Sequence, residues 1–200
     1  MAVKIDEAGL RKLFPEIDWI KDDTLRQGVI DIWLEVAGEC AWERFEDVPK
    51  SFGTEEYRGL VGHIRGVTQM AVALAKIAHD LHGTPCDMDL LVAAGLLHDA
   101  SKPVEAEPDP DKPEGNGKVK PMRKSKLGAN IQHAVYAAHK IFAKGLPVEL
   151  AHLVVTHTHK SNVRTPTFEG ACLFYADYAD SDANIVPAGG KSFAQRWTLH

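Results

Sequence analysis

Six side chains with metal-ligand chemistry lie within or at the ends of apolar segments of the sequence. They are four histidines and two aspartates: His63, His98, Asp99, His133, His157 and Asp177. Burying such polar groups is costly unless each has a hydrogen-bonding partner, a metal ion or water. Imidazole and carboxylate ligands suit iron, manganese, cobalt, nickel or zinc, whereas the lack of thiolates argues against a structural zinc site. The pattern therefore predicts a site for a divalent transition metal.

The stretch GLLHDASK (residues 95–102) adds a lysine to this chemistry at the end of an apolar run. Lys102 follows Asp99 by three residues, so a helical conformation brings the two side chains within one turn of each other. The ammonium could then act on the same anionic substrate as a metal bound by Asp99. A buried network of histidine, aspartate and lysine that holds no metal is the alternative explanation of these residues.

The elements that must position these residues are predicted to be helices. An apolar helical period runs through six segments: residues 25–36, 61–81, 88–98, 127–143, 147–157 and 168–180. No alternating strand of convincing length is present, and His133 is expected inside the helix at 127–143. Helices that pack around one core can bring polar residues together in the interior of a bundle. We therefore predict an all-α, single-domain helical bundle.

Further regions frame this predicted bundle. Residues 1–54 are expected to form an N-terminal helical segment that packs on a core domain at residues 55–185. Residues 103–121 are rich in proline, glycine and charged residues, which predicts a long loop that is either a functional lid or disordered. The end of the chain, residues 186–200, is predicted to be a mobile tail.

Composition and charge narrow the possible partners. The chain has 200 residues, of which 44% are hydrophobic and 26% are charged, and its net charge of −5 gives no support to binding of polymeric nucleic acid or a membrane surface. Its three cysteines show no CxxC spacing, and no apolar run approaches the roughly 20 residues that span a bilayer. We expect a cytoplasmic protein that binds a small anionic substrate. The oligomeric state stays open.

Five short motifs, in order along the chain, resemble the HD-domain metal-dependent phosphohydrolases: GHIRGVTQMAVALA, LLHDASKP, NIQHAVYAAHKIFAKGLP, VVTHT and YADY. The resemblance runs from about residue 60 to residue 183. The branch that looks most similar is the symmetrical dinucleoside tetraphosphate hydrolases, in which a His-Thr pair ends the fourth helix and an Ala-Asp pair lies in the last. These pairs are His157-Thr158 and Ala176-Asp177 here. The loop after residue 102 is longer than in compact members, and nothing before residue 55 matches the family.

The resemblance implies a role for each candidate residue. Four residues match the ligands of a first metal: His63, His98, Asp99 and Asp177. His133 and His157 match the additional histidines of members that hold two metals, in which Asp99 bridges the ions. Lys102 matches a lysine that contacts the substrate phosphate or the metal-bound nucleophile, so Asp99 and Lys102 are the expected catalytic residues. The implied cofactor is one or two divalent ions (iron, manganese, cobalt, nickel or zinc), and the implied activity is hydrolysis of a small phosphate ester or anhydride, such as a nucleotide.

Several assignments have alternatives that the sequence leaves open. A diiron oxygenase similar to myo-inositol oxygenase or the phosphonate-cleaving oxygenases would use the same ligands, and a binding module with a degenerate site is a third possibility. His159 competes with His157 as a ligand. Arg65 is a candidate for contact with the substrate phosphate or, alternatively, for a surface salt bridge. The basic run at residues 118–126 is either a lid that steers phosphate or a solvated loop.

Overall fold

The computed structural model describes residues 2–51, 59–112 and 120–196, and most of these residues lie in helices. In chain order the helices are α1 (Glu7–Leu13), η1 (Pro15–Trp19), α2 (Asp23–Glu39), η2 (Phe45–Asp47), α3 (Leu60–His82), α4 (Met88–Leu97), α5 (Lys102–Glu105), α6 (Lys126–Asn130), α7 (Val135–Ala143), α8 (Val148–Thr156), α9 (Phe168–Ile185) and α10 (Phe193–Arg196). Two strands of three residues each, β1 (Ala106–Pro108) and β2 (Met122–Lys124), form the described sheet. The predicted all-α class is confirmed. Among the described residues, no helix is long and apolar enough to cross a membrane.

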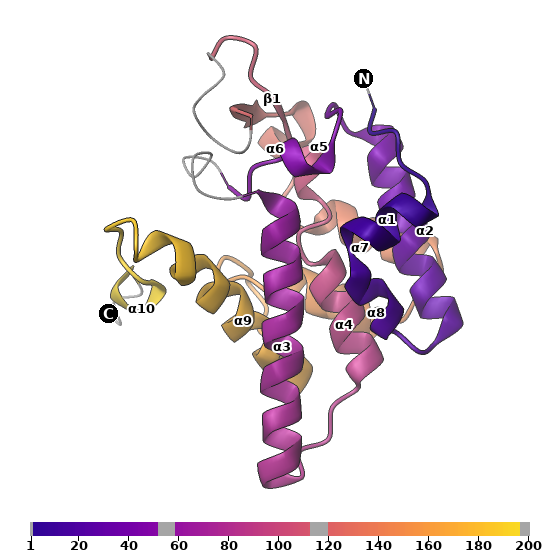
Figure 1. Ribbon diagram of the computed structural model, residues 1–200, viewed down its shortest axis with the longest axis vertical. Helices are drawn as coiled ribbons and strands as arrows, with labels where there is room; N and C mark the ends of the chain where they lie inside the picture. The colour runs from indigo at the N-terminus through magenta and orange to yellow at the C-terminus, as the bar shows by residue number, and fades with distance from the viewer. Residues whose placement is uncertain (1, 52–58, 113–119, 197–200) are drawn as a thin grey trace.

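Helix α3 packs against both α4 and α9, and α9 extends from it to one edge of the molecule (Figure 1). Helix α4 is buried from Leu91 to Leu97, as expected for a segment that is apolar on every side. It begins where the Asp87 carboxylate accepts a hydrogen bond from the Leu90 amide at 2.9 Å, a typical N-cap contact. Helix α3 ends at Gly83, which adopts a left-handed φ of 67°. The chain reverses direction between the end of α3 and the start of α4. The start of α3 and the end of α4 lie in the same part of the core.

The N-terminal segment packs on this core through its aromatic residues. The Trp33 ring lies between Phe14 and Phe45, with ring centroids 4.9 and 5.1 Å apart. Its indole N–H donates to the Leu96 carbonyl at 3.2 Å. Farther along, the Trp42 indole donates to the Ala106 carbonyl at 2.9 Å, which ties the same segment to β1. The N-terminal segment from Phe14 to Phe45 is therefore part of the wall around the end of α4.

The predicted helix at residues 127–143 is wrong, because the structure has two helices there. Helix α6 ends at Asn130 and α7 begins at Val135, and Ala134 between them adopts a left-handed φ of 71°. The break is fixed by a contact that helical periodicity does not reveal. The Glu105 carboxylate accepts hydrogen bonds from the Ala134 amide at 3.2 Å and from His133 Nδ1 at 2.8 Å. His133 therefore lies in the break and not inside a helix.

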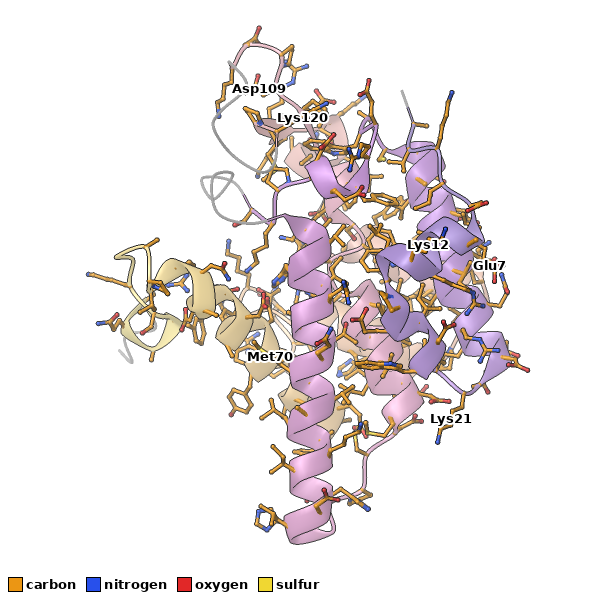
Figure 2. All side chains as sticks on the ribbon, viewed as in Figure 1. Glu7, Lys12, Lys21, Met70, Asp109 and Lys120 are labelled. Carbon is orange, nitrogen blue, oxygen red and sulfur yellow. The ribbon has the colours of Figure 1, made fainter. Side chains whose placement is uncertain are left out.

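The segment predicted as a loop at residues 103–121 begins with ordered structure. Helix α5 occupies its start, and β1 pairs antiparallel with β2 in the register Ala106↔Lys124. Figure 2 shows Asp109 and Lys120 at the end of this hairpin. The Lys120 amide donates to the Asp47 carbonyl at 3.0 Å, so the hairpin also contacts the N-terminal segment. Residues 113–119, which contain part of the predicted loop and the start of the basic run, lie outside the described residues.

The segment predicted as a mobile tail contains α10, which contacts α9. The Phe193 amide donates to the Asp182 carboxylate at 2.8 Å, and Arg196 forms an ion pair with the same carboxylate at 3.2 Å. The Phe193 ring stacks on Tyr178 with the ring centroids 3.6 Å apart. These contacts bring residues 193–196 beside the second half of α9. Residues 197–200 lie outside the described residues.

Candidate metal centre

The structure brings all six predicted ligands together in two groups of three. The first group consists of His63 of α3, His98 at the end of α4 and Asp177 of α9. The second group consists of Asp99, His133 in the α6–α7 break and His157 at the end of α8. Within each group the candidate ligand atoms all lie within 4.8 Å of one another. Helices far apart in the sequence thus deliver these side chains to one point in the core.

Two of the histidines are oriented by the backbone of their own helix. His98 Nδ1 lies 2.7 Å from the carbonyl oxygen of Gly95, and His157 Nδ1 lies 2.6 Å from that of Val154. A carbonyl oxygen can only accept, so each Nδ1 carries the hydrogen. The neutral ring then presents the lone pair of Nε2 to the centre, which is the form that binds a metal.

The other two histidines are oriented by carboxylates. His63 Nδ1 lies 2.5 Å from Asp180 Oδ2, and His133 Nδ1 lies 2.8 Å from Glu105 Oε2. A carboxylate that accepts from the outer nitrogen of a ligating histidine fixes the ring and makes the inner nitrogen more basic. Each of the two groups therefore contains one histidine held by a carboxylate and one held by a main-chain carbonyl.

The inner atoms of the first group face one another at close range. His63 Nε2 lies 3.2 Å from His98 Nε2 and 3.2 Å from Asp177 Oδ1. With Nδ1 of both rings protonated, the facing atoms are all hydrogen-bond acceptors, and such an arrangement is unfavourable unless a cation or a proton lies among them. The donor set fits a divalent transition metal. The second group has the same character.

Asp99 faces both groups, with one carboxylate oxygen toward each. Its Oδ2 lies 3.2 Å from His63 Nε2 and 3.5 Å from His98 Nε2. Its Oδ1 lies 3.0 Å from His133 Nε2 and 3.7 Å from His157 Nε2. Only 3% of the side chain is exposed. A carboxylate with this geometry can give one oxygen to each of two cations.

In each group, one histidine has a raised pKa and the other has a lowered pKa. Burial opposes protonation of His63, but the carboxylates of Asp177, Asp180 and Asp99 outweigh it and raise its pKa to about 9. Burial likewise opposes protonation of His133, and Asp99 and Glu105 raise its pKa to about 9. Burial lowers the pKa of His98 to about 3. Without metal, one imidazolium in each group offsets the carboxylates, and a bound cation would replace that proton.

A cavity of about 770 Å³ opens onto this centre. The ligands Asp99, His133, His157 and Asp177 contribute to its wall, together with Lys102. Lys102 Nζ lies 3.5 Å from Asp99 Oδ2, which places its ammonium at the edge of the centre. The volume is within the range of small-molecule sites, roughly 300–1,000 Å³. A small molecule with a phosphate group therefore has room beside the metal ligands.

Two candidate residues from the sequence are not part of either ligand group. Arg65 forms an ion pair with the buried Glu16 at 3.0 Å and does not line the cavity. It follows His63 by two residues, and two residues on a helix differ in direction by about 200°, so it faces away from the centre. Arg65 is therefore not retained as a substrate contact. His159 contacts the Tyr178 hydroxyl, whereas His157 faces Asp99.

Three residues at the centre were not predicted from the sequence. Asp180 and Glu105 orient histidines, and Lys50 lies 3.9 Å from Asp177. The spacing of Asp180, three residues after Asp177 on one helix, was a usable signal because it brings both to one face. Lys50 lies outside any helix or strand, where no periodicity could mark it.

A family model described as HD domain matches residues 60–182 of the chain. The chain belongs to the HD domain family. The match contains all six candidate ligands and Lys102, and it starts at the first residue of α3. HD domains bind divalent metals, and the two ligand groups could hold such ions. The predicted HD-type fold is thereby confirmed.

One curated relative extends the match beyond the HD residues. The dihydroneopterin 2′,3′-cyclic phosphate phosphodiesterase of Methanocaldococcus jannaschii is 27% identical over 190 residues, which cover 93% of this chain and 68% of the relative. This coverage includes most of the segment before α3. Together with the HD domain, this relative confirms the predicted enzyme class, an HD-domain phosphohydrolase. The relative does not support the finer resemblance to symmetrical dinucleoside tetraphosphate hydrolases. No solved structure gives a significant match.

Proposed function

We propose that this HD-domain chain hydrolyses a small cyclic phosphodiester, of the kind in which a 2′,3′-cyclic phosphate is attached to a nucleoside or a related heteroaromatic compound. We further propose that the reaction takes place at two divalent ions held by the six clustered histidines and aspartates. The curated relative supports the substrate class, because it is a phosphodiesterase of such a cyclic phosphate. The geometry of the ligands supports the two-ion centre.

The observation that carries the proposal is the position of Asp99 between the two groups. Each of its oxygens faces two imidazole nitrogens of one group at 3.0–3.7 Å. A single-ion site would need only one such set of acceptors. Two ions about 3.5–4 Å apart lower the pKa of a shared water and offset charge on both the attacking and the leaving oxygen.

The other residues bind and orient the substrate in this proposal. Lys102, on the Asp99 side of the cavity wall, pairs with a phosphoryl oxygen and offsets the negative charge that develops on it during attack. Asp180 and Glu105 hold the rings of His63 and His133, so that no ligand has to reorient when substrate enters. The cavity wall beyond the ligands, which includes Met122, supplies apolar surface for the rest of the substrate.

The test is a substrate panel run on protein purified without chelators and reloaded with manganese, iron or zinc. We expect hydrolysis of 2′,3′-cyclic nucleotides or dihydroneopterin cyclic phosphate, its loss with a chelator, and its return when metal is added back. Elemental analysis should give two ions per chain. Cleavage of a dinucleoside tetraphosphate in place of the cyclic esters would instead favour the branch suggested by the short motifs.

Two further outcomes would contradict the proposal. Oxygen uptake with a mixed-valent iron signal would indicate a diiron oxygenase on the same scaffold, and stable protein without metal or turnover would indicate a binding module. The comparisons favour neither of these alternatives.

A further inference from the structure

A second lysine lies beside the metal centre and comes from outside HD residues 60–182. Lys50 follows η2 in the N-terminal segment, and its Nζ lies 3.9 Å from Asp177 Oδ1 and hydrogen-bonds to the Ser181 hydroxyl. Only 16% of its side chain is exposed. A buried ammonium needs partners that replace its hydration. Asp177 and Ser181 supply one long ion pair and one neutral acceptor, which leaves capacity for an anion.

The backbone that carries Lys50 is held by contacts on two sides. The Leu60 amide, at the start of α3, donates to the Val48 carbonyl at 2.8 Å. The Lys120 amide, next to β2, donates to the Asp47 carbonyl at 3.0 Å. The approach of Lys50 to the site is therefore set by packing of the N-terminal segment against both α3 and the hairpin.

Lys50 and Lys102 both border the first ligand group, and each lies beside a different carboxylate. Lys102 Nζ lies 3.5 Å from Asp99 Oδ2, and Lys50 Nζ lies 3.9 Å from Asp177 Oδ1. These two carboxylate oxygens each lie 3.2 Å from His63 Nε2, so both ammoniums border the same set of acceptors. Both lysines also line the cavity.

A cation at the first group would change the charge balance around these lysines. The carboxylates of Asp99 and Asp177 would then share their negative charge with the cation. The two ammoniums would be left as excess positive charge on the wall of the cavity, at the mouth of the centre. An oxyanion that enters between them would restore the balance, and a phosphoryl group has several oxygens for that purpose.

We propose that Lys50 is a substrate-contacting residue that, together with Lys102, holds phosphoryl oxygens over the first ligand group. The proposal rests on the proposed phosphohydrolase function and adds to it a residue from the segment before the HD match. The competing explanation is structural, with Lys50 only neutralising Asp177. The two explanations differ in what removal of the ammonium does to phosphate binding and to metal content.

The experiment measures binding of inorganic phosphate to the manganese-loaded protein by calorimetry, with metal content measured by elemental analysis. Lys50→Met removes the charge and keeps most of the stem, and Lys50→Arg keeps the charge. We expect Lys50→Met to weaken phosphate binding at least about 10-fold, the size expected for loss of one charge-assisted hydrogen bond. Lys50→Arg should stay within about threefold of the wild type, and both variants should keep their manganese.

Two additional variants make the result interpretable. Lys12→Met removes one charge from the exposed face of α1 in the same N-terminal segment (Figure 2), and it should bind phosphate like the wild type. Ser181→Ala removes the hydroxyl that contacts Lys50 Nζ, and it should weaken phosphate binding by about twofold to fivefold. If Lys50→Met does not fold, Ser181→Ala decides the question, since wild-type affinity in that variant would overturn the proposal.

Wild-type phosphate affinity in Lys50→Met would overturn the role of Lys50, and so would loss of manganese from that variant. The proposed function stands or falls separately, on hydrolysis. Turnover of a cyclic phosphodiester combined with Lys50-independent phosphate binding would keep the function and reject this role. Lys50-dependent phosphate binding without any phosphodiester turnover would keep the role and reject the function.

Discussion

Two clusters of charged side chains in this fold differ in the source of their compensating charge. On the surface, Lys140 of α7 lies 2.8 Å from Glu35 and 2.5 Å from Glu39 of α2, and Lys144 lies 2.5 Å from Glu35. Each carboxylate there has an ammonium from the chain itself. In the metal centre, carboxylates and imidazole nitrogens face one another, and the lysines lie at the edge. The surface cluster is complete as folded, whereas the buried cluster needs extra protons or metal cations among its acceptors.

The comparison gives a physical criterion for a functional site. Both clusters join helices that are distant in sequence, and both contain several carboxylates. What distinguishes the centre is that buried acceptors converge, which folding alone would not favour. A cluster in which every acceptor meets a donor from the chain can be explained by stability alone. A cluster in which acceptors meet acceptors points to a ligand.

Asp99→Asn should break the buried cluster most severely, because Asp99 faces both groups. Asparagine keeps the shape but has no charge to give to either ion. We expect activity to fall at least about 10³-fold, beyond the effect of losing one oriented donor, and most of the metal to be lost. Elemental analysis and turnover of the best substrate would be measured together, with circular dichroism as the folding control. Full metal content in a folded variant would show that the ligands lie elsewhere.

Lys102→Ala tests whether the lysines at the edge of the centre serve the substrate and not the metal. Turnover should fall about 10²-fold, the size expected for one preorganised charge in the transition state. Metal content should not change, since an ammonium is not a ligand. The reduction should be much smaller for any neutral substrate. Metal loss, or an anionic substrate turned over at the wild-type rate, would contradict this assignment.

Asp180→Asn and Glu105→Gln sharpen the comparison by separating the two ligand groups. Each variant removes the carboxylate that holds one histidine, His63 in the first group and His133 in the second. Metal affinity should fall about 10–100-fold in each. A competition titration against a chromophoric chelator should show that the two variants weaken different ions. Equal weakening of both ions by one variant would argue against two separable groups.

Lys140→Met should have the smallest effect, because it breaks only the surface cluster. We expect a loss of about 0.2–1 kcal/mol in the free energy of unfolding at neutral pH, reduced by salt. Lys140 lowers the pKa of both Glu35 and Glu39 below the usual value of 4.5. A lowered carboxyl pKa stabilises the fold above pH 4.5, and this stability disappears as pH falls through the lowered pKa. Urea unfolding at several pH values should therefore show that the stabilities of the variant and the wild type converge in acid. The activity of the variant should equal that of the wild type.

Much of the centre was predictable because several of its ligands lie at the end, or on the buried face, of a helix with a strong apolar pattern. His98 and His157 each close an apolar helix, and Asp177 lies on the buried face of α9. Such positions can be recognised in the sequence as polar residues in an otherwise apolar helical pattern. The family resemblance then indicated that these residues form one site, which periodicity alone does not show.

The predictions from the sequence fail where tertiary contacts override the local pattern of apolar residues. The sequence from 127 to 143 favours one helix, but Glu105 draws His133 and Ala134 into a break. Gly128 permits this arrangement, because a Cβ there would lie 1.9 Å from the Glu105 carbonyl oxygen. Lys50 escaped notice for a related reason. Its position depends on hydrogen bonds to α3 and to the hairpin, and no spacing within its own segment records them.

The two ways of holding a histidine imply different vulnerability to mutation. The rings of His98 and His157 are fixed by main-chain carbonyls three residues earlier, and no substitution can delete a carbonyl. The rings of His63 and His133 depend on the side chains of Asp180 and Glu105, and a single-codon change can remove either. Each ion would thus have one histidine whose orienting contact survives any side-chain substitution and one whose orienting contact does not. A substitution at Asp180 or Glu105 can therefore weaken the centre in a sequence that still has all four histidines.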